Sequence, residues 1–294
     1  MYFKETKKDV LEIEDGVCFP IRVWLPKKAP KAIFLAIHGG MAHAGDWVTP
    51  ALFFAEKGIA TVAFDLWGHG NFPKHNKKCK LLLHIDSFED YIDSTKCVLD
   101  YIKKEYPKTP VFILGHSLGG LISLNYGLTK AKGEKAIKGF IVSSPWLKNI
   151  VGIPPVLKVL SKVFSVIYPK LPSPADLNID DLTRDKTIKK RHLKDEKAGL
   201  RGTKGTPRFL IEAEKAQKWT SENLKNWKKF PLFVVIAGKD RLADPEFSEN
   251  VLEKVPKKLI TLIKYEENYH ENFNEINREE IFNKIHKWML PLMK

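Results

Sequence analysis

The sequence contains few cysteines and lacks a long uncharged apolar run. Cys18, Cys79 and Cys97 are far apart and form no C-x-x-C pair, which argues against a disulfide framework and against a zinc site. A reducing compartment is the simplest interpretation. No uncharged apolar run approaches the roughly 18 residues that a membrane-spanning helix needs, and the polar first ten residues are unlike a signal peptide. We therefore expect a soluble, cytoplasmic protein.

Positive charge is in excess, and half of it comes from one segment. The formal net charge is +14, and residues 184–208 carry ten Lys or Arg against three Asp or Glu, a local +7. Such a patch attracts anionic surfaces at long range. Two interpretations stay open, a solvated lysine-rich surface and a peripheral contact with an anionic membrane. Nucleic acid is not expected as a partner, because no helix-turn-helix, zinc-finger or RNA-binding signature accompanies the charge.

Apolar runs without alternation recur along the chain, separated by segments of helical periodicity. Strands that read in this way are buried on both faces, which is typical of a parallel sheet between layers of helices. The first 25 residues predict an antiparallel hairpin at the sheet edge, since Asp15-Gly16 is a turn signal. The sequence therefore predicts an α/β fold with a mostly parallel central sheet. The apolar runs cover residues 32–37, 59–64, 110–114, 137–142, 231–236 and 259–263.

Residues 145–225 break this rhythm. They contain a proline-rich stretch, an apolar helical run over 156–168 and then the basic segment. We expect residues 1–144 and 226–294 to form the core, with 145–225 as a helical cap. Counting the two strands of the N-terminal hairpin, this cap is inserted after the sixth strand, the run 137–142.

The segment Gly115-His116-Ser117-Leu118-Gly119 matches the pattern G-x-S-x-G. It follows the strand V-F-I-L directly and opens the helix L-I-S-L-N-Y-G-L, which is the strand–turn–helix context that a nucleophile elbow needs. The helix N-terminus favours developing negative charge beside the serine. A glycine-rich turn without chemistry is the alternative. Ser117 is therefore the candidate nucleophile.

A serine hydroxyl needs a base within hydrogen-bond reach, and the base needs an orienting carboxylate. In this fold the chain order is nucleophile, acid, base. His270 follows the last predicted strand and is the candidate base, whereas its rival His286 lies inside the terminal helix. Asp240 follows the preceding strand and is the candidate acid, with Glu246 as its rival. A loop histidine and a turn aspartate without catalytic roles are the alternatives.

Two backbone amides must also point at one oxygen to stabilise an oxyanion. We expect the amide of Leu118, next to the nucleophile, and the amide of Gly40 in the loop after the first buried strand. An ordinary Gly-Gly turn is the alternative for Gly40. The chemistry implied is acyl transfer through an acyl-enzyme on Ser117, which requires neither a metal nor an organic cofactor.

At this point the motifs resemble those of a known family. G-H-S-L-G-G, A-G-K-D-R-L-A-D, Y-E-E-N-Y-H, H-G-G-M-A-H-A-G, F-D-L-W-G-H-G and L-T-R-D-K-T look like segments of monoglyceride lipases and lysophospholipases, and the resemblance covers most of residues 30–290. It implies the α/β-hydrolase fold, the same five site residues, and a small lipid ester such as a monoacylglycerol or lysophospholipid as substrate. The chain departs from the family pattern at Met41, where a second glycine is usual, and at Asn71.

The apolar run 150–168 suggests a lid over the site. We expect Ile153, Leu157, Leu160 and Phe164 to contact an acyl chain, while Lys158 and Lys162 share a face toward water or lipid headgroups. A cap helix simply packed on the core is the alternative.

The leading hypothesis is a carboxylic ester hydrolase acting on single-chain lipid esters. An amide or peptide hydrolase of the iminopeptidase type would require an acidic group for the substrate amine, which the basic and apolar cap disfavours. A non-catalytic lipid- or membrane-binding protein on the same scaffold is a third hypothesis. Ser117 excludes the epoxide hydrolase and dehalogenase mechanisms, because those use an aspartate nucleophile.

Overall fold

A large twisted sheet forms the centre of the computed structural model, which describes residues 5–12, 16–76, 79–150, 152, 154–175 and 177–293. Within the described residues the sheet has eight strands, which in spatial order are β1 (Lys7–Glu12), β2 (Cys18–Trp24), β4 (Ile59–Phe64), β3 (Ala32–Ile37), β5 (Val111–His116), β6 (Ile137–Ser143), β9 (Leu232–Ala237) and β10 (Ile260–Tyr265). β2 pairs antiparallel with both β1 and β4, and the remaining neighbours are parallel.

The six apolar runs predicted as strands are strands. β3, β4 and β9 are buried at every position, because helices cover both faces of the sheet. β5 begins at Val111 and not at Pro110, since proline has no N–H for the ladder. The predicted N-terminal hairpin is also confirmed, with β1 at the sheet edge and Gly16 at a φ of 72°. Asp15 lies outside the described residues.

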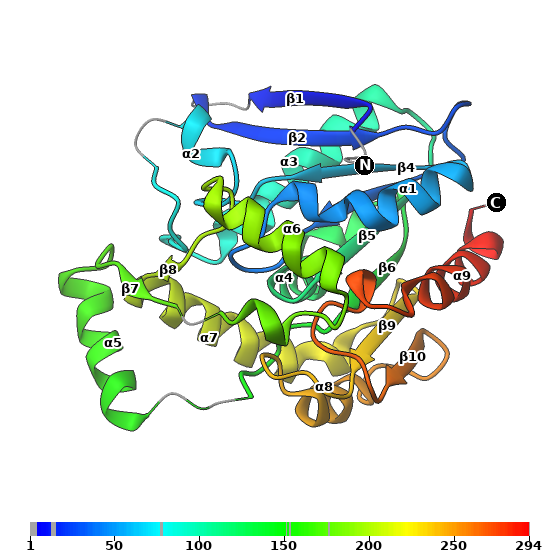
Figure 1. Ribbon diagram of the computed structural model, residues 1–294. Coiled ribbons are helices and arrows are strands. Elements are labelled where there is room, and N and C mark those ends of the chain that lie inside the picture. Colours follow the sequence, from blue (N-terminus) through cyan, green and yellow to red (C-terminus); the bar gives the residue numbers. More distant parts are fainter. Residues whose placement is uncertain are drawn as a thin grey trace.

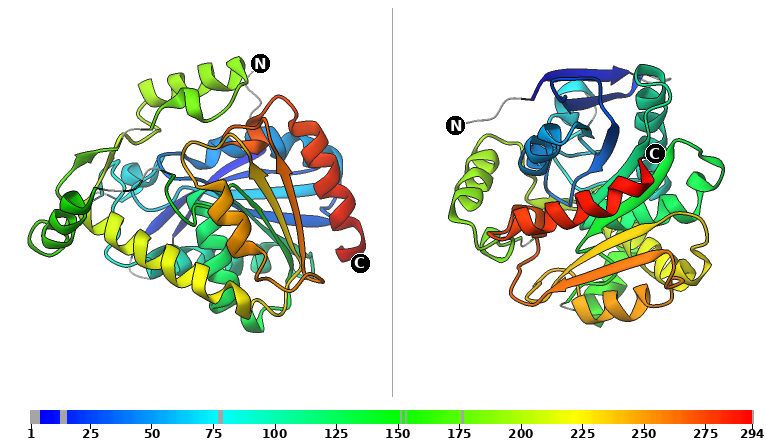
Figure 2. Two further views of the ribbon diagram at one scale, coloured as in Figure 1. Left: turned by 90° about the horizontal axis from the view of Figure 1, so that it is seen from below. Right: turned by 90° about the vertical axis from the view of Figure 1, so that its right-hand side faces the viewer.

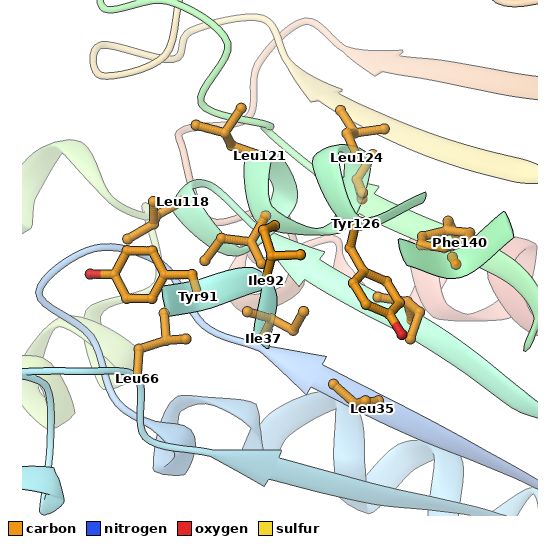
Figure 3. Packing of buried hydrophobic residues seen from close by; sticks show 14 of the residues in the cluster. Leu35, Ile37, Leu66, Tyr91, Ile92, Leu118, Leu121, Leu124, Tyr126 and Phe140 are labelled. Atoms are coloured by element: carbon orange, nitrogen blue, oxygen red, sulfur yellow. The ribbon is translucent and has the colours of Figure 1, made fainter. Parts of the chain in front are cut away.

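Helices form a layer on each face of the sheet (Figures 1 and 2). α1 (Val48–Glu56) and α9 (Arg278–Met289) cover one face and contact each other through Phe53 and Phe282, whose ring centroids are 5.3 Å apart. On the other face lie α3 (Glu89–Glu105), α4 (Leu118–Leu128) and α8 (Pro245–Leu252). Figure 3 shows side chains of α3 and α4 meeting those of β3 in the larger core cluster.

The chain leaves the sheet after β6 and returns to it at β9, so the insertion follows the sixth strand as predicted. Between these strands α7 (Pro207–Asn223) packs against α4, and the two-residue strands β7 (Ser173–Pro174) and β8 (Lys204–Gly205) pair antiparallel. The remaining helices of this segment are α5 (Pro155–Ile167) and α6 (Lys186–Lys197). In Figure 1, α5 lies far from the sheet and α6 lies in front of it. We refer to residues 145–225 as the inserted segment.

Helix α5 is strongly apolar but mostly exposed. Ser165 is its buried residue, whereas seven apolar side chains are between 43% and 77% exposed. Lys158 forms an ion pair with Glu214 of α7, with 2.9 Å between Nζ and Oε1. The polar stripe of α5 therefore faces α7, and the apolar stripe faces outward. The exposed apolar residues are Val156, Leu157, Val159, Leu160, Val163, Val166 and Ile167. In the part of the chain that the structure describes, no helix has the length and apolar character to cross a bilayer.

Candidate active site

Ser117 lies on a tight turn between β5 and α4. Its φ of 54° and ψ of −116° are rarely adopted by a residue with a side chain, a strain that clusters at functional sites. The turn requires both glycines of the motif. A Cβ on Gly115 would lie 2.4 Å from the carbonyl oxygen of Gly119, and one on Gly119 would lie 2.0 Å from that of Ile37. The G-x-S-x-G pattern thus reflects the close approach of β3, β5 and α4.

His270 and Asp240 lie in the loops after β10 and β9 and contact each other. His270 Nδ1 donates to Asp240 Oδ2 at 2.7 Å, and both residues are buried. The other carboxylate oxygen accepts from the backbone N–H groups of Leu242 at 2.8 Å and Ala243 at 3.0 Å. The carbonyl oxygen of His270 accepts from Ser144 Oγ at 2.8 Å. These bonds fix the orientation of both the carboxylate and the imidazole.

Electrostatics of the pair favour a charged Asp240. Burial alone would lower the pKa of His270, but the Asp240 carboxylate outweighs it and raises the pKa above 6.5. Burial opposes ionisation of Asp240, and the charge and hydrogen bond of His270 nevertheless lower its pKa below its usual value. With the proton assigned to Nδ1 by this hydrogen bond, Nε2 of His270 is free to accept another.

A cavity of about 470 Å³ brings the predicted site residues together. Ser117, His270, Gly40 and Leu118 all line it. A Cβ on Gly39 would lie 3.3 Å from Cβ of Ser117, so the loop after β3 runs beside the serine. The rival residues Glu246 and His286 lie in α8 and α9 and are not among the residues that line this cavity.

The cap residues are placed differently from the expectation. Leu157 and Leu160 are exposed and Phe164 is half-buried beside Tyr168, and none of the three lines the cavity. From α5 it is Ser161 that lines it. The expected orientation was wrong because Lys158, Ser161 and Ser165 share the face toward α7, which turns the leucines outward. Ile153 lies outside the described residues.

Sequence reasoning missed most of the cavity wall. Leu83, Trp146 and Phe209 line it, together with the charged side chains of Arg201 and Glu271. Trp146 carried a signal, because it follows the carboxyl end of β6 at the sheet edge where sites of such folds form. Leu83, Phe209 and Arg201 come from loops and helices with no local pattern that points to a site.

A cluster of possible metal ligands lies next to the cavity, in the described part of the chain. Donor atoms of His43, Asp46 and Asp195 lie within 4.8 Å of one another. However, Arg201 Nη1 donates to Asp46 Oδ2 at 2.6 Å and already supplies a positive charge there. The arrangement is that of a buried ion pair, which a cation would have to displace.

A family model described as "Serine aminopeptidase, S33" matches residues 28–277. The chain belongs to this family of hydrolases. Phospholipase YtpA of Bacillus subtilis is 30% identical over 253 residues, which are 86% of this chain and 93% of that protein. The monoacylglycerol lipase of Mycolicibacterium smegmatis is 26% identical over 276 residues, 94% of each chain. Human monoglyceride lipase is 27% identical over 282 residues, 94% of this chain and 88% of the relative.

Solved structures of this α/β-hydrolase fold agree with the architecture. Monoacylglycerol lipase from Paleococcus ferrophilus superposes with a TM-score of 0.78 at 23% identity, over 93% of this chain and 99% of that one. A soluble variant of monoglyceride lipase from Saccharomyces cerevisiae, in complex with a substrate analogue, gives 0.82 at 20% identity over 99% and 97%. At these identities the likeness establishes the α/β-hydrolase fold that the motifs predict.

Proposed function

We propose that the chain is a carboxylic ester hydrolase that cleaves single-chain lipid esters through an acyl-enzyme on Ser117. The observation that carries this proposal is the hydrogen bond from His270 to Asp240, together with the place of His270 in the same cavity wall as Ser117. Relatives named monoacylglycerol lipase and phospholipase support a lipid ester as substrate.

The proposed reaction uses the loops at the carboxyl edge of the sheet. Ser117 Oγ attacks the ester carbonyl while Nε2 of His270 takes its proton. The backbone amides of Gly40 and Leu118 stabilise the oxyanion. The bond from the carbonyl carbon to the alcohol oxygen breaks, and His270 returns the proton to the alcohol. Water then releases the acid from Ser117 by the same steps.

The cavity walls favour an acyl chain. They include Met41, Leu83, Trp146, Phe209 and Leu210, and each methylene buried against such a surface contributes roughly 0.8 kcal/mol. A volume of about 470 Å³ lies in the range of small-molecule sites. These walls therefore fit a single chain with a small head group.

Amide hydrolysis is the second candidate function, because the family model takes its name from an aminopeptidase. An aminopeptidase of this kind would need an acidic group to bind the substrate amine. Glu271 is an acidic side chain of the cavity, but one of its oxygens already accepts from His192 and Asn274 at 2.8 Å each. Arg201 Nη2 lies 3.9 Å from its other oxygen, so a substrate amine there would meet a positive charge, which favours an ester substrate.

We also propose that the outward face of α5 docks on a lipid surface. Lipid substrates are taken from such surfaces, and amphipathic helices bind them through buried apolar area together with basic charge. The exposed valines and leucines of α5 supply the apolar area. Exposed lysines of α6 in the same inserted segment, namely Lys186, Lys190 and Lys197, complement anionic headgroups.

Labelling with a fluorophosphonate probe tests the enzyme proposal. We expect the wild type to be labelled covalently and Ser117→Ala to be unlabelled, with Ser87→Ala, an exposed serine at the start of α3, as the matched control. Hydrolysis of p-nitrophenyl esters of increasing chain length, of monoacylglycerols and of an aminoacyl amide then identifies the substrate class. Absence of Ser117-dependent labelling would favour a non-catalytic lipid-binding protein, and activity restricted to acetyl esters would contradict the acyl-chain proposal.

A further inference from the structure

Two charged side chains line the cavity although they are almost completely buried. Arg201 is 4% exposed and comes from the inserted segment, shortly after α6. Glu271 is 5% exposed and directly follows the candidate base His270. Burying charges costs several kcal/mol unless they are paired and hydrogen-bonded, so their place at the reaction site requires a reason.

A chain of hydrogen bonds orients both side chains. Arg201 Nη1 donates to Asp46 Oδ2 at 2.6 Å and lies 3.1 Å from Nδ1 of His192. Nε2 of His192 lies 2.8 Å from Glu271 Oε2, which also accepts from Asn274 Nδ2 at 2.8 Å. One tautomer satisfies both contacts of His192, with the proton on Nε2 and Nδ1 as the acceptor. Arg201 and Glu271 are thereby held at fixed positions relative to each other.

The remaining polar atoms of the pair are available to a ligand. Among the described residues, Nε and Nη2 of Arg201 and Oε1 of Glu271 have no hydrogen bond, and Nη2 lies 3.9 Å from Oε1. That separation is too long for a hydrogen bond between them. A donor and an acceptor side by side are the complement of a hydroxyl group, which accepts and donates at once.

We propose that Arg201 and Glu271 form the subsite for the hydroxyl groups of the leaving alcohol, and that they select a neutral polyol over a phosphate-bearing head group. This inference rests on the proposed ester hydrolase function and specifies its substrate class as monoacylglycerols. A phosphate would gain a contact with Arg201 but would meet the Glu271 carboxylate beside it, and such repulsion is strong where water is excluded. A glycerol head group satisfies both residues without adding charge.

The ionisation of Glu271 agrees with this assignment. Burial opposes its ionisation, but His192 and Arg201 hold the pKa of the carboxyl well below its usual range. The carboxylate is therefore charged at neutral pH and accepts hydrogen bonds from a hydroxyl group.

Three lauroyl substrates with different leaving groups test the proposal: 1-lauroylglycerol, lauroyl lysophosphatidylcholine and p-nitrophenyl laurate. In Arg201→Lys, which loses the planar fork, kcat/KM for lauroylglycerol relative to p-nitrophenyl laurate should fall about tenfold. In Glu271→Gln, which removes the repulsive charge, the ratio of lauroylglycerol to lysophosphatidylcholine should fall by a similar factor. The wild type should prefer lauroylglycerol to the lysophospholipid.

Arg191→Lys is the matched control. Arg191 Nη2 lies 4.0 Å from Asp46 Oδ1 in the same ion cluster, but Arg191 lines an outer surface groove and is not among the residues that line the catalytic cavity. Both substrate ratios should stay at the wild-type value in this variant, whereas a merely structural role of the cluster would shift them as in Arg201→Lys. If Arg201→Lys fails to fold, the ratio of kcat/KM for lauroylglycerol to that for lysophosphatidylcholine in Glu271→Gln tests the proposal by itself.

The inference is overturned if the wild type prefers lysophosphatidylcholine, or if the ratios in the folded variants equal those of the wild type. Those results would leave the ester hydrolase proposal intact, provided that p-nitrophenyl laurate is hydrolysed and that Ser117→Ala abolishes this activity. If p-nitrophenyl laurate is not hydrolysed, or if Ser117→Ala retains the activity, the proposed function itself is wrong and the subsite proposal fails with it.

Discussion

The helices α4 and α5 are both rich in apolar residues, but they differ in burial. All eleven residues of α4 are buried between the sheet and its neighbouring helices, whereas in α5 Ser165 is the buried residue. An apolar helix is expected to be buried all round, in a core or in a membrane. α4 satisfies this rule within the fold. α5 is amphipathic instead, with a polar stripe toward α7 and an apolar stripe that the described residues leave exposed.

The core and the inserted segment also contribute different kinds of residues to the cavity. Core loops supply Ser117, His270 and Asp240, which are held by close backbone approaches and buried hydrogen bonds. The inserted segment supplies Trp146, Ser161, Arg201 and Phe209, among other residues of the cavity wall. Changes at the candidate catalytic residues should therefore affect the rate of the chemical step, and changes in buried core helices should affect the stability. Changes at Arg201 and on the outer face of α5 should affect substrate choice and surface binding.

Asp240→Asn tests the core side and should have the largest effect. A neutral amide neither holds the correct tautomer of His270 nor stabilises its positive charge, so kcat should fall on the order of 10⁴-fold. The base must be neutral to accept a proton, so wild-type kcat/KM should fall as the pH drops through the raised pKa of His270. Without the Asp240 carboxylate, burial lowers the pKa of His270, so the acid limb of the pH–rate profile should move to lower pH.

Asp244→Asn is the control for this prediction. Asp244 caps α8 through a hydrogen bond from Phe247 N and lies close to the loop of Asp240. Its replacement should cost about 1 kcal/mol of stability or less and leave the pH profile in place. An acid limb that stays unchanged in Asp240→Asn would contradict the proposed role of Asp240.

Leu124→Ala and Leu157→Ala compare the two helices directly. Leu124 is fully buried in α4, so its truncation should lower the free energy of unfolding by about 2–5 kcal/mol. Leu157 is 53% exposed in α5, so the same truncation should cost about 0.5 kcal/mol. Urea denaturation measures both values, and similar losses would mean that α5 packs more closely than the structure indicates.

Val166→Asp tests the outer face of α5 and should have the smallest effect of the three. Val166 is 77% exposed, and an aspartate there removes apolar area and adds repulsion from anionic headgroups. Partitioning onto anionic vesicles, measured by co-sedimentation, should fall about tenfold, because a valine side chain contributes roughly 1.5 kcal/mol when buried.

Val10→Asp provides the matched control, since Val10 is 38% exposed in β1 at the far edge of the sheet. It should leave vesicle binding as in the wild type. High salt should weaken the binding by screening the basic segment. Equal losses in both variants would argue against docking through α5.

The core and the loops of the site could be predicted because their signals are local. Buried strands read as apolar runs, and G-x-S-x-G marks a turn that only glycines permit at Gly115 and Gly119. Asp240 and His270 follow strands that end at the same edge, so their meeting follows from the parallel arrangement.

The inserted segment could not be predicted to the same depth. The orientation of α5 depends on its contact with α7. The apolar stripe by itself therefore led to the wrong expectation that these side chains line the cavity. The link from Arg201 to Asp46 joins residues 155 positions apart, and neither residue belongs to a motif. Such pairings arise from tertiary packing, which a single sequence does not encode as a periodic pattern.

The close approach of Gly119 to the carbonyl of Ile37 has a mechanical consequence. The turn that carries the serine and the strand that leads into the Gly39–Gly40 loop touch backbone to backbone, so neither can shift without the other. The spacing between Ser117 and the Gly40 amide is thereby set by contacts within the core, whichever substrate occupies the cavity.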